Sequence, residues 1–245
     1  MMNEEYVTYD PRIPKHKSSL SKAIIIFIAI YFGIEILFDA LYSEEAIILL
    51  GAKWNEGIAN GEYWRFLTST FLHGSLIHLF LNLAALHIFA TEVESIYGSL
   101  RFLIIYLLTS WGAGLASYAF SPGLAIGASG AAFGIIGALI IFFYRQKDKV
   151  PGANLKFRAM YTLVIINLAL GFMIPRIDNA GHLGGLLSGL LLAWFIAPEY
   201  KLEKEEGVLK VVQKPDKSRV ISGIVLVITI LFWLTKTTTE RFHGI

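Results

Sequence analysis

Seven long apolar runs constrain this chain more than any other feature, and they lie near residues 22–42, 72–91, 100–120, 127–144, 159–175, 180–197 and 220–235. An α-helix needs roughly 17 to 25 apolar residues to cross the ~30 Å hydrocarbon core of a bilayer. The mean hydropathy of the chain is +0.59, and only 16% of its 245 residues are charged. The sequence therefore predicts an all-α polytopic membrane bundle of seven spans, of which the last is short.

Positive charges are distributed unevenly between the segments that connect these runs. If the N-terminus is cytoplasmic, 16 of the 21 Lys and Arg residues fall in cytoplasmic segments. Because cytoplasmic loops of membrane proteins are enriched in Lys and Arg, we expect the N-terminus inside and the C-terminus outside, most simply in the cell membrane. We interpret the basic loops as topology signals and expect no nucleic-acid partner. No A-x-A site closely follows the first run, so we expect it to be a retained span.

Several kinds of hydrolytic site are excluded by composition and spacing. The chain contains no Cys, which rules out thiol catalysis and cysteine-ligated metals. No H-E-x-x-H motif is present for a zinc protease, no pair of Asp residues lies on separate spans, and no Lys lies within a span to form a Ser-Lys dyad. We expect neither a metal nor another cofactor.

The segment Gly127–Gly134, which reads G-A-S-G-A-A-F-G, opens the fourth run after a Pro-Gly pair. Because Pro and Gly mark loops, Ser129 is expected in or near the first turn of a helix. One interpretation is a G-x-x-x-G contact between helices, with Ser129 as a further small polar residue. The other is a nucleophile, which needs a neighbouring base and donors for an oxyanion. Ala131 stands where the G-x-S-x-G nucleophile elbow requires Gly, and no strand precedes the segment.

Candidate partners for Ser129 occur on two other runs. His78 and Asn82 are four residues apart and share a helix face, while His182 lies in a glycine stripe of Gly181, Gly185 and Gly189. These residues all lie within the first two turns of runs that begin outside, so their depths match that of Ser129. Close approach of the two glycine-rich helices would place His182 beside Ser129, and His78, Asn82 and the Ser129 N–H would form an oxyanion hole. On spacing alone, His78 and Asn82 are explained equally well as hydrogen bonds between helices.

The aromatic segment 43–71 and two acidic residues near the outside are explained by structural roles. Residues 43–71 are too polar to span and too apolar for a plain linker, and Trp54, Tyr63 and Trp64 suit the headgroup level. We therefore expect an amphipathic loop in the outer leaflet. Glu35 lies near the outer end of the first run, where we expect it to bond backbone or solvent. Asp178 lies on the wrong turn to orient His182, so no triad is predicted.

The motifs together resemble the rhomboid family of intramembrane serine proteases. They cover roughly residues 20–197 and are Gly51-Ala52, Trp64-Arg65, His73, His78-x-x-x-Asn82, Glu94 with Gly98, Gly127-x-Ser129-Gly130, and Gly181-His182-x-x-Gly185. The resemblance implies Ser129 as nucleophile, His182 as base, and His78 and Asn82 as oxyanion stabilisers. It also implies that Glu94 belongs to a hydrogen-bond network at the inner turn. Many members have Tyr four residues after the serine, packed on the histidine, where this chain has Phe133; ring stacking can survive that change.

We expect four segments along the chain: a cytoplasmic tail (1–20), a six-span rhomboid core (21–198), a basic cytoplasmic linker (199–219), and a seventh transmembrane helix with an outside tail (220–245). The resemblance implies that the substrates are single-span or polytopic membrane proteins, cut in or near their transmembrane segments through an acyl-enzyme. The alternative is an inactive rhomboid-like protein that binds transmembrane clients, although inactive relatives typically lack the serine or the histidine. A carrier is disfavoured because no paired halves with broken helices are apparent.

Overall fold

The fold is a bundle of long helices. The computed structural model describes residues 8–10, 15–42, 46–174, 177–205, 208–214 and 216–244. Among these residues, seven helical segments are long and apolar enough to cross a membrane: α1 (Leu20–Tyr42), α5 with η3 and α6 (Leu76–Ala85, Leu86–Ala90 and Thr91–Tyr97), α7 (Ser99–Phe120), α8 (Ser129–Gln146), α9 (Ala153–Met173), α10 (Asn179–Ile196) and α11 (Lys217–Phe242). The predicted all-α polytopic fold is confirmed. The prediction that the last span is short is wrong, because α11 has 26 residues.

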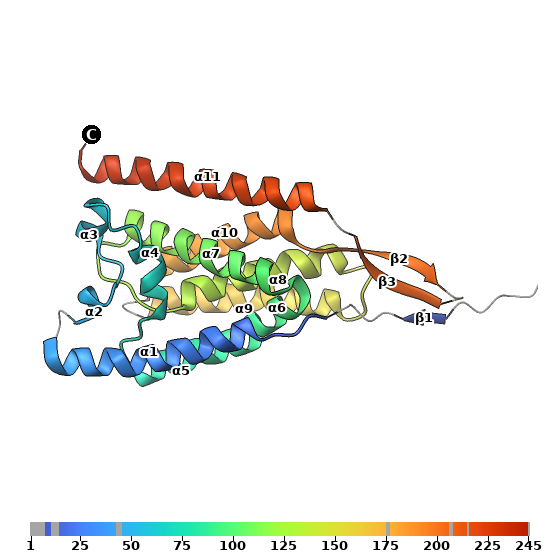
Figure 1. Ribbon diagram of the computed structural model, residues 1–245, viewed down its shortest axis with the longest axis horizontal. Coiled ribbons are helices and arrows are strands. Elements are labelled where there is room, and N and C mark those ends of the chain that lie inside the picture. Colours follow the sequence, from blue (N-terminus) through green and yellow to red (C-terminus); the bar gives the residue numbers. More distant parts are fainter. Residues whose placement is uncertain are drawn as a thin grey trace, which may run out of the picture.

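Helix α8 lies near the centre of the bundle, where α10 and α7 pack against it (Figure 1). Two thirds of the apolar parts of α7 and α8 are buried inside the protein, whereas α9 and α1 are mostly exposed. Helices α8 and α10 approach so closely that a Cβ atom added at Gly185 would overlap the carbonyl oxygen of Gly130. Gly189 meets the carbonyl oxygen of Gly134 in the same way. The glycine stripes therefore set the separation of these two helices.

The segment between α1 and α5 folds into short helices at one end of the bundle (Figure 1). They are α2 (Ala46–Leu49), α3 (Asn55–Ala59), α4 (Arg65–Thr68) and the 3₁₀ turn η2 (Ser69–Phe71). Arg65 holds this segment together, since its Nη1 donates to the carbonyl oxygens of Ile48 at 2.8 Å and Ala52 at 3.0 Å. Its guanidinium group also lies over the Trp64 ring. The segment is thus a folded loop and not a span.

Glu94 joins three helices at the opposite end of the bundle. Its fully buried carboxylate accepts hydrogen bonds from the backbone N–H groups of Leu20 and Ser21, at 3.0 and 2.7 Å, and from the hydroxyls of Ser21 and Ser99, each at 2.6 Å. These donors lie at the first turns of α1 and α7, where N–H groups have no partner within the helix. One carboxylate therefore satisfies two N–H groups at the start of α1 and, through the Ser99 hydroxyl, ties α1 and α6 to the start of α7.

Replacing Glu94 by Gln is expected to lower the free energy of unfolding by about 2–4 kcal/mol, because the amide presents an NH₂ group to donors and weakens charge-assisted hydrogen bonds. Thermal and denaturant unfolding in detergent micelles would measure the change. Glu92→Gln is the matched control on the same helix, since Glu92 pairs with the exposed amine of Lys156 and such pairs contribute at most about 1 kcal/mol. Equal effects of the two substitutions would contradict the role given to Glu94.

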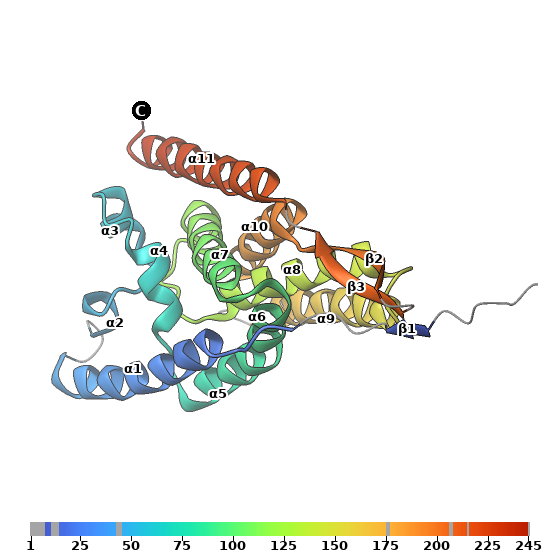
Figure 2. The same cartoon turned by 45° about the vertical axis from the view of Figure 1, so that its right-hand side comes forward.

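A small sheet extends beyond the helices at the end opposite α2, α3 and α4 (Figure 2). Strands β2 (Glu199–Glu205) and β3 (Val208–Lys214) form an antiparallel hairpin, and β1 (Thr8–Asp10) pairs in parallel with β3. The sequence predicted only a linker over residues 199–219, so the hairpin within it is an addition. Residues 1–7 and 11–14 of the predicted tail lie outside the described residues.

Candidate active site

Ser129 is placed by a tight loop at the start of α8. Gly127 has φ +115°, a left-handed conformation that favours glycine, and its N–H donates to the Ser69 carbonyl oxygen at 2.9 Å. Ala128 caps α8, so Ser129 is the first helical residue. A first-turn N–H has no partner within its helix and lies at the positive end of the helix dipole. The Ser129 hydroxyl and N–H are therefore both available for chemistry.

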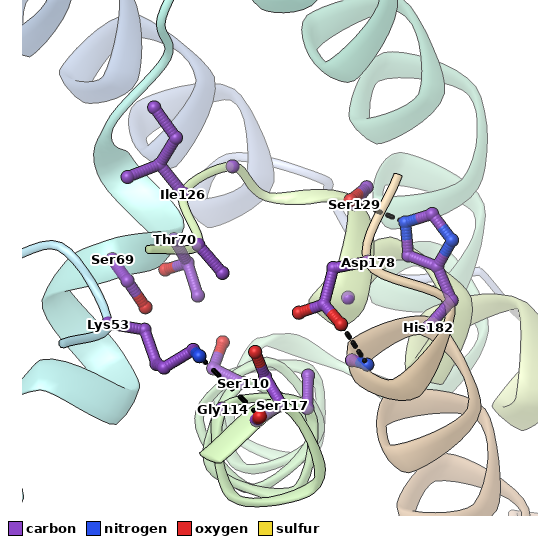
Figure 3. Close-up of a pocket in the computed structure, with 15 residues that line it drawn as sticks. Lys53, Ser69, Thr70, Ser110, Gly114, Ser117, Ile126, Ser129, Asp178 and His182 are labelled. Carbon is purple, nitrogen blue, oxygen red and sulfur yellow. Dashed lines mark hydrogen bonds between the residues drawn. The ribbon is translucent and has the colours of Figure 1, made fainter. Parts of the chain in front are cut away.

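His182, the fourth residue of α10, faces Ser129 across the close contact between α8 and α10. Its Nε2 lies 2.8 Å from the Ser129 Oγ (Figure 3). The Phe133 ring stacks on the imidazole, with ring centroids 4.4 Å apart and planes inclined by 8°. The structure thus brings together the two side chains that the sequence placed at matching depth, and Phe133 retains the stacking without a hydroxyl.

Asp178 does not bond to the imidazole of His182. Its Oδ1 accepts hydrogen bonds from the Gly181 N–H at 3.0 Å and the Ser121 hydroxyl at 2.8 Å, so it caps the start of α10. Within the described part of the chain, His182 Nδ1 is buried without a hydrogen-bond partner. The arrangement is therefore a serine–histidine pair and not a triad, in line with the sequence analysis.

His78 and Asn82 lie on α5 against the loop that precedes Ser129. A Cβ atom added at Gly127 would lie 2.6 Å from His78 Nε2 and 3.9 Å from Asn82 Nδ2. Asn82 Nδ2 also donates to the His78 carbonyl oxygen at 2.9 Å. Both side chains therefore lie beside Gly127, two residues before Ser129 in the sequence.

The turn before α5 is fixed by an acidic side chain of α1. Glu35 Oε2 accepts a hydrogen bond from the His73 N–H at 2.7 Å, and the His73 ring lies 5.1 Å from the ring of His78. Burial lowers the pKa of His73 to about 4, so this neighbour of His78 is neutral at pH 7. The expectation that Glu35 bonds backbone is met.

A small cavity of about 50 Å³ adjoins the serine–histidine pair. Ser129 and His182 line one side, Asp178 lies between the helices, and Lys53 reaches in from the loop before α3 (Figure 3). Sequence reasoning counted Lys53 only as one of the outside charges, since nothing in its neighbours signals burial. Among the described residues, no group of three His, Cys, Asp or Glu side chains is arranged to hold a metal ion.

A family model described as Rhomboid domain matches residues 60–199, which is more than half of the chain. The chain belongs to the rhomboid family. It is 43% identical over 152 residues to the rhomboid protease GluP of Bacillus subtilis (strain 168), covering 61% of this chain and 29% of that protein. It is 37% identical over 145 residues to RHOMBOID-like protein 1 of Arabidopsis thaliana, covering 57% of this chain and 36% of the relative.

A further relative is Rhomboid-like protease 3 of Toxoplasma gondii, which is 31% identical over 162 residues, covering 64% of this chain and 60% of that protein. The chain spans less than two thirds of the length of each of these three relatives. Membership of the rhomboid family, together with the seven apolar helices, makes this an integral multi-pass membrane protein.

Helix α11 lies outside the matched rhomboid region and packs along α10 and α7. Trp111 Nε1 donates to the Thr235 hydroxyl at 3.1 Å, and the Phe242 ring stacks on Tyr118. His243 Nε2 lies 2.9 Å from the Ala59 carbonyl oxygen of α3. The extra helix thus contacts both the rhomboid core and the loop at the Ser129 end.

Proposed function

We propose that this rhomboid is an intramembrane serine endopeptidase that hydrolyses peptide bonds in or near transmembrane segments of other membrane proteins. Ser129 is the nucleophile and His182 the general base. The observation that carries the proposal is the 2.8 Å separation of Ser129 Oγ and His182 Nε2 between helices held together by glycines. Membership of a family that includes the rhomboid protease GluP supports it.

The geometry supports a two-step acyl transfer. Neutral His182 accepts the hydroxyl proton of Ser129 while Oγ attacks the substrate carbonyl carbon, and the protonated imidazole then donates to the departing amine nitrogen. His182 then takes a proton from water as the water oxygen attacks the acyl carbonyl carbon. The protonated imidazole returns this proton to Ser129 Oγ as the bond between Oγ and the acyl carbon breaks, which releases the second product. Protonated His182 cannot act as the base, so the resting imidazole must be neutral.

The oxyanion formed in each step needs hydrogen-bond donors at the start of α8. The Ser129 N–H is one, and His78 Nε2 and Asn82 Nδ2 face the same loop from α5. Donors fixed before the reaction stabilise developing charge because they need little reorganisation. The role given to His78 requires the tautomer that carries the proton on Nε2.

Two features of the site favour hydrolysis without a third catalytic side chain. Stacking on Phe133 fixes the plane of the imidazole that a carboxylate fixes in a triad. The cavity of about 50 Å³ is large enough for a few water molecules, which supplies room for the water that deacylation consumes. Both features support hydrolysis by the serine–histidine pair without a third catalytic side chain.

The charge distribution supports an active site that opens toward the outside of the membrane. The loops rich in Lys and Arg lie at the end opposite Ser129, and such loops are typically cytoplasmic. We therefore place the N-terminus in the cytoplasm and the site toward the outer face of the cell membrane. Cysteine introduced at Asn60, an exposed residue with φ −83° at the end of α3, should react with an impermeant maleimide on intact cells.

Two measurements on the purified parent chain test the proposed activity. A fluorophosphonate should label Ser129, identified by mass spectrometry, and a reporter with one transmembrane segment should be cut in liposomes. Labelling without cleavage would show a reactive serine with an unsuitable reporter. If the folded protein is neither labelled nor able to cut the reporter, the proposal is overturned. That outcome would favour the alternative, an inactive rhomboid-like protein that binds transmembrane clients.

Replacing Asn82 by Ala is expected to lower kcat by roughly 10²- to 10³-fold, the cost of one oxyanion donor in a site of this kind. KM should change little, because the interaction strengthens only as the negative charge develops. Kinetics with the reporter substrate would separate the two constants.

The chain offers a matched control for Asn82. Asn167 on α9 donates to a carbonyl oxygen four residues earlier in its own helix, at 2.8 Å, just as Asn82 donates to His78. Asn167→Ala should keep the parent kcat. A similar loss in both variants would mean that Asn82 acts through helix stability and not at the oxyanion.

A further inference from the structure

Lys53 is a fully buried cation that the proposed chemistry leaves without a role. It is 1% exposed, and its Nζ donates to Asn55 Oδ1 at 2.9 Å and to the carbonyl oxygens of Ser121 at 2.8 Å and Gly123 at 2.7 Å. Burial of a charged amine is costly unless the group is hydrogen-bonded or paired. Three close acceptors explain how a charged amine can remain buried here, and they show which parts of the chain it binds.

All of the backbone acceptors belong to the end of α7 and the loop that leads to Ser129. Ser121 is the C-cap of α7, where carbonyl groups lack partners within the helix and a cation interacts favourably with the helix dipole. The backbone of Lys53 also pairs with Ala125, whose carbonyl oxygen and N–H both bond to it, at 3.0 and 3.2 Å. Side chain and backbone together fasten one loop to the other.

Ser121 continues this connection to the helix that carries His182. While its carbonyl oxygen accepts from Lys53, its hydroxyl donates to Asp178 Oδ1 at 2.8 Å. The same oxygen of Asp178 accepts the Gly181 N–H, and the Asp178 carbonyl oxygen accepts the His182 N–H at 3.0 Å. Lys53 thus contacts the loop before the nucleophile directly and the base through two residues.

We propose that Lys53 is a positioning residue, whose ammonium group holds the loop 121–127 and, through Ser121 and Asp178, the start of α10, so that Ser129 and His182 stay in register. Lys53 does not touch the reacting atoms. The inference rests on the proposed function and adds to it a requirement for a charged amine behind the site (Figure 3).

The charges that face Lys53 make the requirement sensitive to pH. Burial lowers the pKa of Lys53 to about 8, and the carboxylates of Asp178 on α10 and Glu56 on α3 oppose that shift. The native state therefore loses this proton above about pH 8. A neutral amine has two N–H groups for its three close acceptors, so one acceptor loses its donor and the loop is held less firmly.

The first test compares fluorophosphonate labelling of Ser129 in the parent, Lys53→Met and Lys236→Met chains in detergent. Methionine keeps the length of the side chain without a donor, and misplacement by about 1 Å costs roughly 100-fold, so Lys53→Met should label at least about tenfold more slowly. Reporter KM should change less than about twofold. Lys236, an exposed residue of α11, should be replaceable without effect, while a parent labelling rate in folded Lys53→Met would overturn the inference.

The second test is the pH dependence of labelling, which a merely structural lysine would not alter. The rate in the parent should fall as pH rises through about 8, and Lys53→Met should lack this fall. Asp178→Asn retains a good helix cap but removes the carboxylate that favours charged Lys53, so the fall should move to lower pH. Glu56→Gln, away from Ser121, should cause a smaller displacement.

These measurements distinguish a failure of the proposed function from a failure of the role of Lys53. A parent chain that is folded but never labelled would overturn the proposed function, and with it the role of Lys53. A labelled parent whose rate shows no fall between pH 7 and 9.5, or the same fall in Asp178→Asn, would overturn the role of Lys53 alone. The profiles of the parent and Asp178→Asn decide the matter even if Lys53→Met does not fold.

Discussion

Ser129→Ala and His182→Ala are each expected to cleave the reporter roughly 10⁴- to 10⁶-fold more slowly than the parent, and the double variant should be no slower than either single variant. The two side chains act as one unit, because the hydroxyl is a weak nucleophile until the imidazole at 2.8 Å takes its proton. Single-turnover cleavage in liposomes, with fluorophosphonate labelling alongside, would measure all three losses.

A serine elsewhere in α10 supplies the control for this comparison. The Ser188 hydroxyl donates to the Gly184 carbonyl oxygen within its own helix, so Ser188→Ala should retain the parent rate. Losses that multiply in the double variant would show that Ser129 and His182 contribute independently, and would contradict the proposed proton transfer between them.

Gly185→Ala should have the next largest effect, because it acts on stability and geometry together. The added methyl group would overlap the Gly130 carbonyl oxygen, which is backbone and cannot rotate aside. Overpacking of this kind costs about 1–3 kcal/mol or more, and forcing α10 away from α8 separates His182 from Ser129. A shift of about 1 Å would slow labelling roughly 100-fold. Unfolding and labelling would be measured on the same preparation.

Gly33→Ala is the matched substitution. Gly33 lies within α1 with nothing inside 4 Å of an added Cβ, so the change should be neutral or stabilise the helix by up to about 1 kcal/mol. If Gly185→Ala were equally harmless, the close packing of α8 and α10 would not be what positions the site.

The number of spans and the pairing of Ser129 with His182 could be predicted because each follows from patterns that are local to single helices. Hydropathy marks the spans, and polar residues at equal depth on glycine-rich helices have few ways to meet. The Glu94 network could be expected only through resemblance, because its donors lie on α1 and α7, one of them 74 residues away.

Features that depend on contacts between loops could not be predicted. Lys53 lies in a segment whose composition suits the membrane interface, and its burial follows from carbonyl groups some 70 residues later in the chain. The hairpin formed by β2 and β3 was not predicted, because the many charged residues of this segment indicate a linker. Polar and apolar residues alternate in only part of it. Its pairing with residues 8–10 has no local signal, since short strands depend on their partners.

The pairing of β1 with β3 also imposes an order on biosynthesis. Residues 8–10 leave the ribosome before the membrane spans, and their partners at 208–210 follow about 200 residues later, roughly 10 to 40 s at ordinary rates of translation. The sheet is therefore completed only after the six spans of the rhomboid core have been made, as the seventh begins to emerge. The sheet therefore joins the segment before the first span to the segment after the sixth only once all six spans have been made.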